Sequence, residues 1–282
     1  MQSITPDQPF YPHQLLQLHD PPQQLFYEGD ISLAARLCIA VVGSRMMSTY
    51  AQSCMHDLIR PLVRAGMVIV SGLAYGVDAQ AHHLVVKEGG HGIAVVAHGL
   101  DQCYPKANEA LLADLLLDGG LVLSEYPEGT VPLKRNFLAR NRIIAGLAHV
   151  LVIIEAGERS GTFATAQAAL ECGREVAVVP SDITRLENAG GLALLKQGAH
   201  PVCTAQDIAS LAGIKLSDQP LLPPANLTDT QLTLYNQLRL QPQPATKLAE
   251  MLQLPISTIN AALAVLELNA HITYRKGVWL IN

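Results

Sequence analysis

Three segments of the chain combine glycine with hydroxyl or basic side chains in a way that suits the binding of anions. In the first, Gly43, Ser44 and Arg45 follow an apolar run and precede Ser48, a residue type that often caps the start of a helix. Glycine lets the backbone approach a ligand closely, and unpaired amides at a helix start favour an anion such as phosphate. The Arg45 guanidinium can make bidentate contacts with phosphate or guanine. An ordinary surface arginine is an equally good interpretation of this segment taken alone.

The second segment is Ser160, Gly161 and Thr162, at a predicted helix start that follows a strand ending near Glu155. Small residues and hydroxyls at the amino terminus of a helix form an anion cradle. This segment therefore predicts a second contact for a negatively charged ligand.

The third segment, SGLAYGVDAQAH, ends a predicted strand at residues 71–72, turns at Gly76 and places Asp78 at a helix start. We interpret Asp78 as an N-cap that accepts backbone amide hydrogens rather than as a catalytic group. His82 follows one helical turn later, and an Asp78–His82 pair could orient a base. No nucleophile stands near it in the sequence, so catalysis has little support.

Residues 133–147 (LKRNFLARNRIIAGL) form a local block of positive charge, because no acid occurs between Glu128 and Glu155. The candidate polar residues of this block are Lys134, Arg135, Arg140, Asn141 and Arg142. Phe137 stands among the cations. Basic groups that contact phosphates, combined with an aromatic face that stacks a base, are typical of single-strand binding. The alternative is a solvated amphipathic helix with a buried phenylalanine.

Several classes of site lack sequence support. The chain has no Gly-x-Gly-x-x-Gly and no Gly-x-x-x-x-Gly-Lys-Ser/Thr, so neither a dinucleotide cofactor nor ATP hydrolysis is expected. The five cysteines include no Cys-x-x-Cys pair, and none of the ten histidines lies in His-Glu-x-x-His. We therefore expect reduced thiols, no metal site and no cofactor. The net charge of −5 means that any nucleic-acid site must be a local basic surface.

The elements that must position these residues alternate between short apolar strands and amphipathic helices. Such strands are covered on both faces, and the alternation predicts a parallel, doubly wound sheet with ligands at the carboxyl ends of its strands. Helices are predicted at residues 48–65 and 106–117, for example. The predicted strands are residues 38–42, 67–70, 93–96, 121–123, 150–154 and 176–179.

The length of 282 residues favours about two domains. We expect residues 1–37 to be a lead-in that packs on the sheet edge, 38–213 a Rossmann-like DNA-binding domain, and 214–227 a proline-containing linker. Residues 228–282 show three helices and a terminal hairpin, the pattern of a small winged-helix domain. A helical packing module without DNA contact fits that region equally well, because its third helix has no Lys or Arg.

No apolar stretch approaches the ~20 residues of a membrane span, and the amino terminus lacks a basic flank followed by an apolar core. These features predict a cytoplasmic protein with no membrane partner.

The ordered motifs together resemble those of the DNA-processing protein A family, also called DprA or Smf. The resemblance runs almost continuously from Tyr11 to Val202 and continues into the carboxyl-terminal domain. Its anchors are DPPQQLFYEGD, VVGSR, SGLAYGVDAQAH, GLDQCYP, SEYPEG, FLARNRIIAGL, EAGERSGTFATAQAAL and GREVAVVP. It implies an extended Rossmann-like fold, a cytoplasmic homodimer without enzymatic activity, and binding and protection of incoming single-stranded DNA. It also implies loading of RecA recombinase during natural transformation, and contact with the single-strand-binding protein.

The resemblance also suggests residue roles. Arg45 would hold a phosphate or a base, Lys134 and Arg140 would grip the strand, and Phe137 would stack. The chain departs from the family pattern at Leu138, where proline is usual, at Ala97 and Ser181, where glycine is common, and at Leu192, where asparagine is common.

Two other functions compete with this one. Related folds include phosphoribohydrolases of nucleoside monophosphates, but ERSGTFATAQAALE lacks their paired glycines, and Glu171 is too far along the helix. Glu125 and Glu155 are possible acids for such a hydrolase, without an evident nucleophile. A transcription regulator that places its winged helix on duplex DNA is disfavoured by the uncharged third helix. The single-strand hypothesis requires Arg45, Lys134 and Arg140 to line one groove, with Arg45 and Phe137 exposed.

Overall fold

The computed structural model describes residues 2–158, 160–216, 227–241, 243–269, 271–275 and 277–281. The chain divides into two compact units, Met1–Leu216 and Ser217–Asn282. Most of the expected linker, residues 217–226, lies outside the described residues, as does Lys276 of the expected terminal turn. The two units are therefore considered separately.

The described part of the first unit contains one sheet in the order β1-β2-β6-β5-β4-β3-β7-β8-β9. Strands β3 to β9 are parallel, whereas β2 runs antiparallel to both β1 and β6. The order changes direction between β3 and β7, which makes that point the topological switch of the sheet. The strands are β1 (Gln2–Ile4), β2 (Leu25–Gly29), β3 (Cys38–Val42), β4 (Val68–Ser71), β5 (Gly92–Val96), β6 (Leu121–Ser124), β7 (Val150–Ile153), β8 (Glu175–Val178) and β9 (His200–Pro201). The expected doubly wound, mostly parallel sheet is confirmed.

The lead-in of residues 1–37 does more than pack on the sheet edge, because it contributes two strands to the sheet. Strand β2 pairs with β6 through Phe26 opposite Ser124 and Tyr27 opposite Leu123. The lead-in also carries a short 3-10 helix, His13–Gln17, whose Leu15 is fully buried. These strands are only three and five residues long, too short to give a clear alternating pattern in the sequence.

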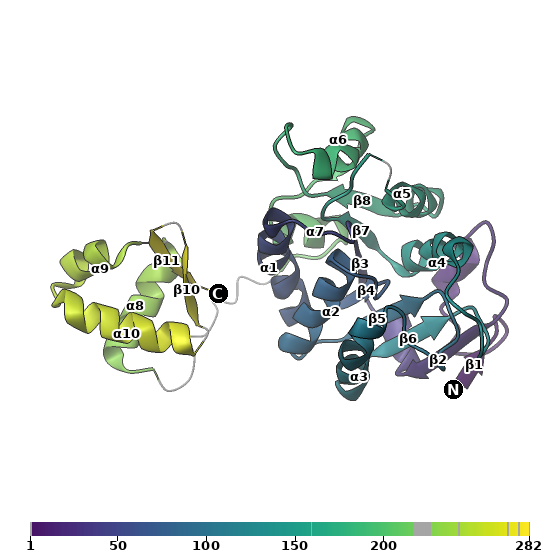
Figure 1. Ribbon diagram of the computed structural model, residues 1–282, viewed down its shortest axis with the longest axis horizontal. Helices are drawn as coiled ribbons and strands as arrows, with labels where there is room; N and C mark the ends of the chain where they lie inside the picture. The colour runs from purple at the N-terminus through teal and green to yellow at the C-terminus, as the bar shows by residue number, and fades with distance from the viewer. Residues whose placement is uncertain are drawn as a thin grey trace. The chain divides into compact units, whose positions relative to one another are not determined.

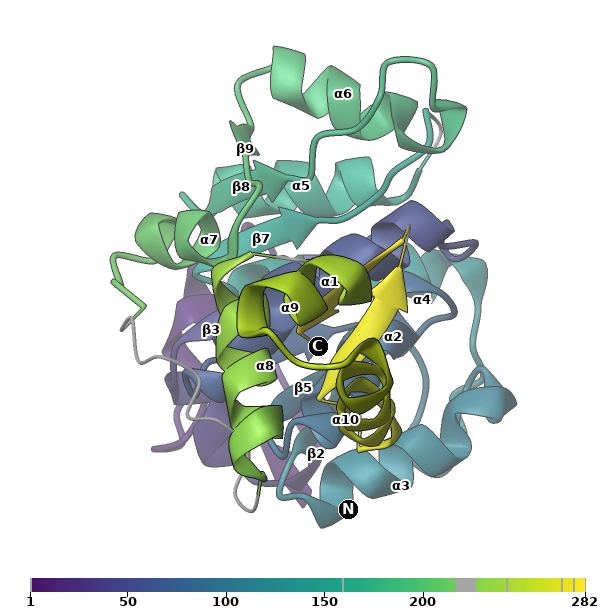
Figure 2. The same ribbon diagram turned by 90° about the vertical axis from the view of Figure 1, so that its left-hand side faces the viewer.

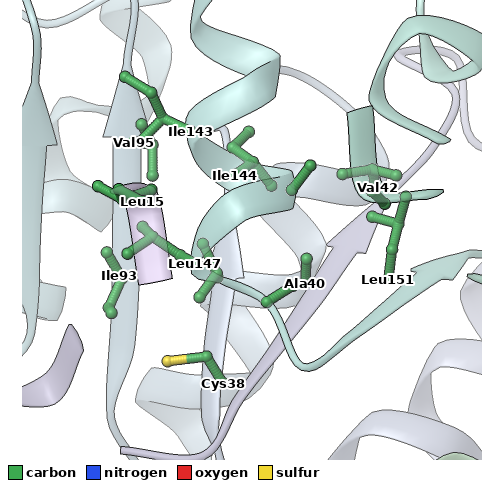
Figure 3. Packing of buried hydrophobic residues seen from close by; sticks show 14 of the residues in the cluster. Leu15, Cys38, Ala40, Val42, Ile93, Val95, Ile143, Ile144, Leu147 and Leu151 are labelled. Atoms are coloured by element: carbon green, nitrogen blue, oxygen red, sulfur yellow. The ribbon is translucent and has the colours of Figure 1, made fainter. Parts of the chain in front are cut away.

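Helices cover both faces of the sheet (Figure 1). One face is covered by α1 (Thr49–Arg64), α2 (Val77–Lys87), α3 (Glu109–Leu117) and α7 (Ala205–Leu211). The other face is covered by α4 (Lys134–Leu147), α5 (Thr162–Glu171) and α6 (Ala189–Lys196). Strand β3 is buried at every position, so its residues alternate between the two cores. In Figure 3, Ile143 of α4 lies beside Val95 of β5, and Leu147 lies near Leu15 and Ile93.

The second unit has its own hydrophobic core, and its helices and hairpin are seen in Figure 2. Helices α8 (Asp229–Leu240), α9 (Ala245–Leu252) and α10 (Ile256–Leu268) precede the antiparallel hairpin of β10 (Ile272–Arg275) and β11 (Val278–Ile281). The fully buried side chains of Leu234, Leu248 and Leu263 bring one residue from each helix to this core. The winged-helix pattern expected from the sequence is confirmed.

Among the described residues, no single helix has the length and apolarity to cross a membrane. Helices α9 and α10 meet those criteria only as a pair, which is bent by 120°.

Candidate nucleic-acid interface

A groove of about 420 Å³ opens at the carboxyl ends of β3 and β7, where the strand order changes direction. This is the position where open α/β sheets hold their ligands. The groove is lined by the β3–α1 turn, the loop before α5 and the middle of α4. Eight of the twelve candidate residues line it: Gly43, Ser44, Arg45, Arg140, Asn141, Ser160, Gly161 and Thr162.

The β3–α1 turn is locked against the turn that follows β4. A Cβ built on Gly43 would lie 2.7 Å from Val77 Cγ2 and 3.0 Å from Glu155 O, so only glycine fits there. Gly76 has a φ of 74°, and a Cβ on it would overlap the carbonyl oxygen of Ser44. Val77 N also donates a hydrogen bond of 3.1 Å to that oxygen. These glycines therefore bring two strand-end turns together and fix one wall of the groove.

Three amides of the β3–α1 turn, those of Ser44, Met46 and Ser48, are already hydrogen-bonded within the protein. Ser44 N donates to Glu155 O at 2.8 Å, and Met46 N donates to Ser44 Oγ at 3.1 Å. Ser48 donates to the buried Glu155 carboxylate through its amide, at 3.0 Å, and through its hydroxyl, at 2.6 Å. The Glu155 carboxylate thus occupies the place at the start of α1 that a phosphate would take. These three amides are therefore not free for an anion, and Ser48 is the N-cap of α1 as expected.

Arg45 is exposed at the rim of the groove and lies against Phe137. Its Cζ is 5.4 Å from the centroid of the half-buried Phe137 ring, and Arg140 Cζ is 5.9 Å from the same centroid. Both distances are typical of cation–π contacts. The structure therefore brings Arg45, Phe137 and Arg140 together from segments about 90 residues apart. Of the three cations that the sequence hypothesis placed in one groove, Arg45 and Arg140 line it and Lys134 does not, and Phe137 is only partly exposed.

Arg140 is buried rather than exposed, with only 4% of its surface accessible. Its Nη1 donates hydrogen bonds to Gly72 O, at 2.7 Å, and to Val95 O, which ties the ends of β4 and β5 together. A Cβ on Gly72 would overlap Arg140 Nη1, so glycine is required there as well. Burial lowers the pKa of Arg140 to about 10, and it therefore stays charged at neutral pH. The hypothesis of a surface cation is corrected here: Arg140 is a fixed charge in the groove wall.

Asp78 is not the N-cap that the sequence suggested. That position belongs to Gly76, and Asp78 is buried in the first turn of α2, where it also lines the groove. Burial raises the pKa of Asp78, whereas Arg140 and the backbone at Ala74 and Gly72 act in the opposite direction. Burial lowers the pKa of His82 to about 4, so this imidazole is neutral at pH 7.

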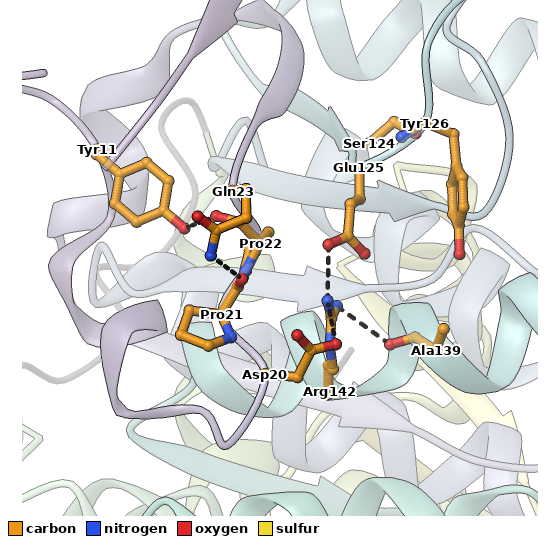
Figure 4. A network of polar contacts seen from close by, with 10 residues as sticks. All are labelled: Tyr11, Asp20, Pro21, Pro22, Gln23, Ser124, Glu125, Tyr126, Ala139 and Arg142. Carbon is orange, nitrogen blue, oxygen red and sulfur yellow. Dashed lines mark hydrogen bonds and ion pairs between the residues drawn. The ribbon is translucent and has the colours of Figure 1, made fainter. Parts of the chain in front are cut away.

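Arg142 is not among the residues that line the groove, and Figure 4 shows its guanidinium beside the carboxylates of Glu125 and Asp20. Its Nη2 lies 2.6 Å from Glu125 Oε1 and 3.4 Å from Asp20 Oδ2. Two residues along a helix turn a side chain by about 200°. Arg142 therefore cannot share the face of Arg140, and its proposed place among the groove cations is corrected.

Lys134 and Arg135 are exposed in the first turn of α4 and are not among the residues that line the groove. That turn contains no acidic residue, and its N-cap, Leu133, makes no side-chain hydrogen bond to the helix. Cations at the amino terminus of a helix are disfavoured by the helix dipole. This helix start therefore has an excess of positive charge that an anion would relieve.

The loop before α5 leaves space above its backbone. The Ser160 hydroxyl donates to Thr162 Oγ1 at 2.7 Å and accepts from Thr162 N at 3.2 Å. Among the residues that the structure describes, a Cβ on Gly157 or Gly161 would meet no atom within 4 Å. These glycines are therefore not required by the packing, and the loop is open to a ligand.

Tyr104 is a rim residue that sequence reasoning did not identify. Its ring centroid lies 5.7 Å from that of Phe137, and 46% of its surface is exposed. The motif GLDQCYP contains it, but an isolated tyrosine gives no sign of which distant ring it will contact.

The fold and this groove define a Rossmann-like α/β protein with a partly basic ligand site at the switch point and a separate winged-helix unit. Residues 2–213 match the family of the DNA recombination-mediator protein A, and residues 218–277 match the DprA winged helix domain. The chain therefore belongs to the DNA recombination-mediator protein A family, whose members are DNA-processing and DNA-binding proteins.

Curated relatives and solved structures agree with this assignment. The chain is 43% identical over 198 residues to the DNA processing protein DprA of Streptococcus pneumoniae, and the match covers 70% of each chain. It is 41% identical over 205 residues to the Protein Smf of Escherichia coli, covering 73% of this chain and 55% of that protein. The pneumococcal DprA structure covers 74% of this chain and 73% of its own, with a TM-score of 0.70 and 41% identity. A structure of DprA from Helicobacter pylori, which describes its single-stranded DNA binding mode, covers 76% of this chain and 97% of its own, with a TM-score of 0.67 and 31% identity.

Proposed function

We propose that this protein binds single-stranded DNA at the groove between the ends of β3 and β7. The observation that carries the proposal is the exposed Arg45, which lines the groove and lies against Phe137. On the same helix as Phe137, the acid-free start of α4 exposes Lys134 and Arg135. Positive side chains at the amino end of a helix destabilise it, because the helix dipole is positive there. A bound polyanion would interact favourably with both the side chains and the dipole. Nucleic acid is the polyanion that the family assignment favours.

The candidate residues then divide by their surroundings. Arg45, Lys134 and Arg135 contact phosphates, since all three are exposed. Arg140 supplies a fixed positive charge beneath the strand, and Asn141 offers an amide from the same wall. The residues Gly43, Ser44, Ser160, Gly161 and Thr162 form the small, polar walls that let the backbone of the strand approach.

A single strand suits this site better than a duplex. The groove is the size of a small-ligand pocket and has aromatic rings at its rim, and only unpaired bases expose faces on which such rings can stack. The helix that would read a duplex, α10, contains no Lys or Arg. The winged helix is therefore not the principal DNA contact in this proposal.

The physiological role that we propose is to protect incoming DNA in the cytoplasm and to load RecA recombinase onto it. A homodimer would carry out this role, in contact with the single-strand-binding protein. The similarity to DNA processing proteins and to a recombination mediator supports this part of the proposal. A hydrolase receives less support from the geometry, because Glu155 is hydrogen-bonded to Ser48 and Glu125 is paired with Arg142.

Fluorescence anisotropy with single-stranded and duplex oligonucleotides of equal length tests the binding proposal. We expect the single strand to bind more tightly and its affinity to fall as salt rises, since phosphate contacts release counterions. Equal affinity for both forms, or affinity that does not respond to salt, would contradict it. Turnover of nucleoside monophosphates by the same sample would favour the hydrolase.

RecA loading is tested by filament formation on DNA that is already covered with the single-strand-binding protein. The proposal predicts faster nucleation of RecA when this protein is present. An unchanged nucleation rate would refute the loading role and leave the binding proposal standing.

A further inference from the structure

The two rings at the groove rim differ in how much of their surface a ligand can reach. Tyr104 lies in the segment between β5 and α3, and 46% of its surface is exposed. Phe137 is half-buried and is therefore less accessible to a ligand. The two ring planes are tilted by 52°. Tyr104 therefore packs on Phe137 without being covered by it.

Phe137 is already contacted on several sides. The guanidinium carbons of Arg45 and Arg140 lie within 6 Å of its ring centroid, and Tyr104 adds a third contact. A base could stack on Phe137 only by displacing one of these groups. Of these two rings, Tyr104 is the one with aromatic surface available without rearrangement.

The segment that carries Tyr104 is tied to its neighbours on both sides. Gln102 Nε2 donates to Thr130 O at 2.9 Å, which anchors the loop ahead of the tyrosine. Behind it, the buried Asn108 donates through Nδ2 to Leu73 O at 2.8 Å, in the turn after β4. A ring held in this way loses little conformational freedom when a ligand binds, and this favours affinity.

We propose that Tyr104 is the residue on which a base of the bound strand stacks, and that Phe137 is a positioning residue that holds the Arg45 guanidinium at the rim for a phosphate. This inference rests on the proposed single-strand binding and assigns separate tasks to its two rings. Stacking of a base on Tyr104 involves no charged group. Phe137, in contrast, affects binding through the charged guanidinium of Arg45. The two rings should therefore respond differently to salt and to removal of the bases.

The test compares Tyr104→Ala with the wild-type chain on two probes, oligo-dT and a fully abasic deoxyribose-phosphate strand of the same length. Stacking of one base corresponds to about 5- to 150-fold in affinity. We expect Tyr104→Ala to weaken oligo-dT binding by about fivefold or more and to leave binding of the abasic strand within twofold. Its salt dependence should match the wild type, because no phosphate contact is lost.

Three variants control for structural effects. Tyr104→Phe keeps the ring and should bind oligo-dT within about twofold of the wild type. Tyr104→Leu keeps apolar packing on Phe137 without a flat face and should bind as weakly as Tyr104→Ala. Phe10→Ala removes a ring that is 70% exposed in the lead-in of the same unit, and it should change nothing.

The possible contrary results separate the inference from the proposed function. Equal weakening on the abasic strand, or a Tyr104→Phe variant as weak as Tyr104→Ala, would assign Tyr104 a structural or hydrogen-bonding role and overturn the inference. Wild-type affinity in Tyr104→Ala would also overturn it while leaving the proposed function intact. A wild-type chain that does not bind oligo-dT would refute the proposed function and the inference together.

Discussion

Replacing Arg45 by alanine should weaken single-strand binding in a way that replacing Arg142 does not. Arg45 is exposed at the groove rim against Phe137, whereas Arg142 is paired with Glu125 and Asp20 outside the groove. A hydrogen bond to a charged group contributes about 1.5–3 kcal/mol, and the lower end suits an exposed contact. We therefore expect Arg45→Ala to lose about tenfold in affinity at low salt.

The salt dependence gives a second, independent magnitude. Each phosphate contact to a single strand contributes about 0.7 to the slope of log affinity against log salt. Arg45→Ala should therefore reduce that slope by about 0.7, so its defect should shrink roughly 2.5-fold between 50 and 200 mM salt. Arg142→Ala should keep the wild-type slope and instead lower the free energy of unfolding, since Glu125 loses its partner.

Fluorescence anisotropy titrations of both variants at four or five salt concentrations, with urea unfolding as a check on stability, supply all of these values. Equal effects of the two arginines on affinity would refute the reasoning. A slope that is unchanged in Arg45→Ala would show that this arginine contacts no phosphate.

Three further predictions follow from the groove and the core beneath it. Phe137→Ala should weaken oligo-dT binding several-fold. Unlike Tyr104→Ala, it should also lower the slope of log affinity against log salt, because Arg45 loses the ring that holds it. An unchanged slope would contradict the positioning role of Phe137. Arg140→Met should lower the free energy of unfolding by about 3–5 kcal/mol, measured by urea unfolding, because Asp78 stays buried without its cation; a loss under 1 kcal/mol would oppose this. His82 has a folded pKa lowered from 6.5 to about 4, so its contribution to stability is present above pH 6.5 and is lost as pH falls toward 4. Between pH 7 and pH 5, the free energy of unfolding should therefore fall by about 2 kcal/mol more in the wild type than in His82→Gln, as measured by urea unfolding. Equal losses in the two proteins would show that the pKa of His82 is not lowered in the folded state.

The sheet could be predicted because each central strand is a continuous apolar run. Strand β3 occupies the predicted residues, and β5, β6 and β7 differ from prediction by one residue at one end. Strands β4 and β8 are each shifted by one residue from the predicted range. Local sequence also identified Ser48 as a helix cap, since its partner, Ala51 N, lies three residues away. The antiparallel strand β2 was missed, because its pairing with β6 joins segments almost 100 residues apart.

The site was predictable in its residue types but not in its geometry. Arg140 and Arg142 look equivalent in the sequence, and only the rotation of α4 against the sheet buries one and pairs the other with Glu125. The carboxylate of Glu155 satisfies the start of α1 from 107 residues away, so no local pattern could reveal it. Tyr104 reaches Phe137 only through the packing of two strand-end loops.

Hydrogen exchange with and without a bound dT oligonucleotide tests the location of the binding site most directly. The account predicts that the amides slowed by DNA lie in residues 43–48, 133–141 and 157–162, with no change in residues 228–269. Protection confined to the winged-helix unit, with exchange at the end of β3 and the start of α4 unaltered, would contradict it.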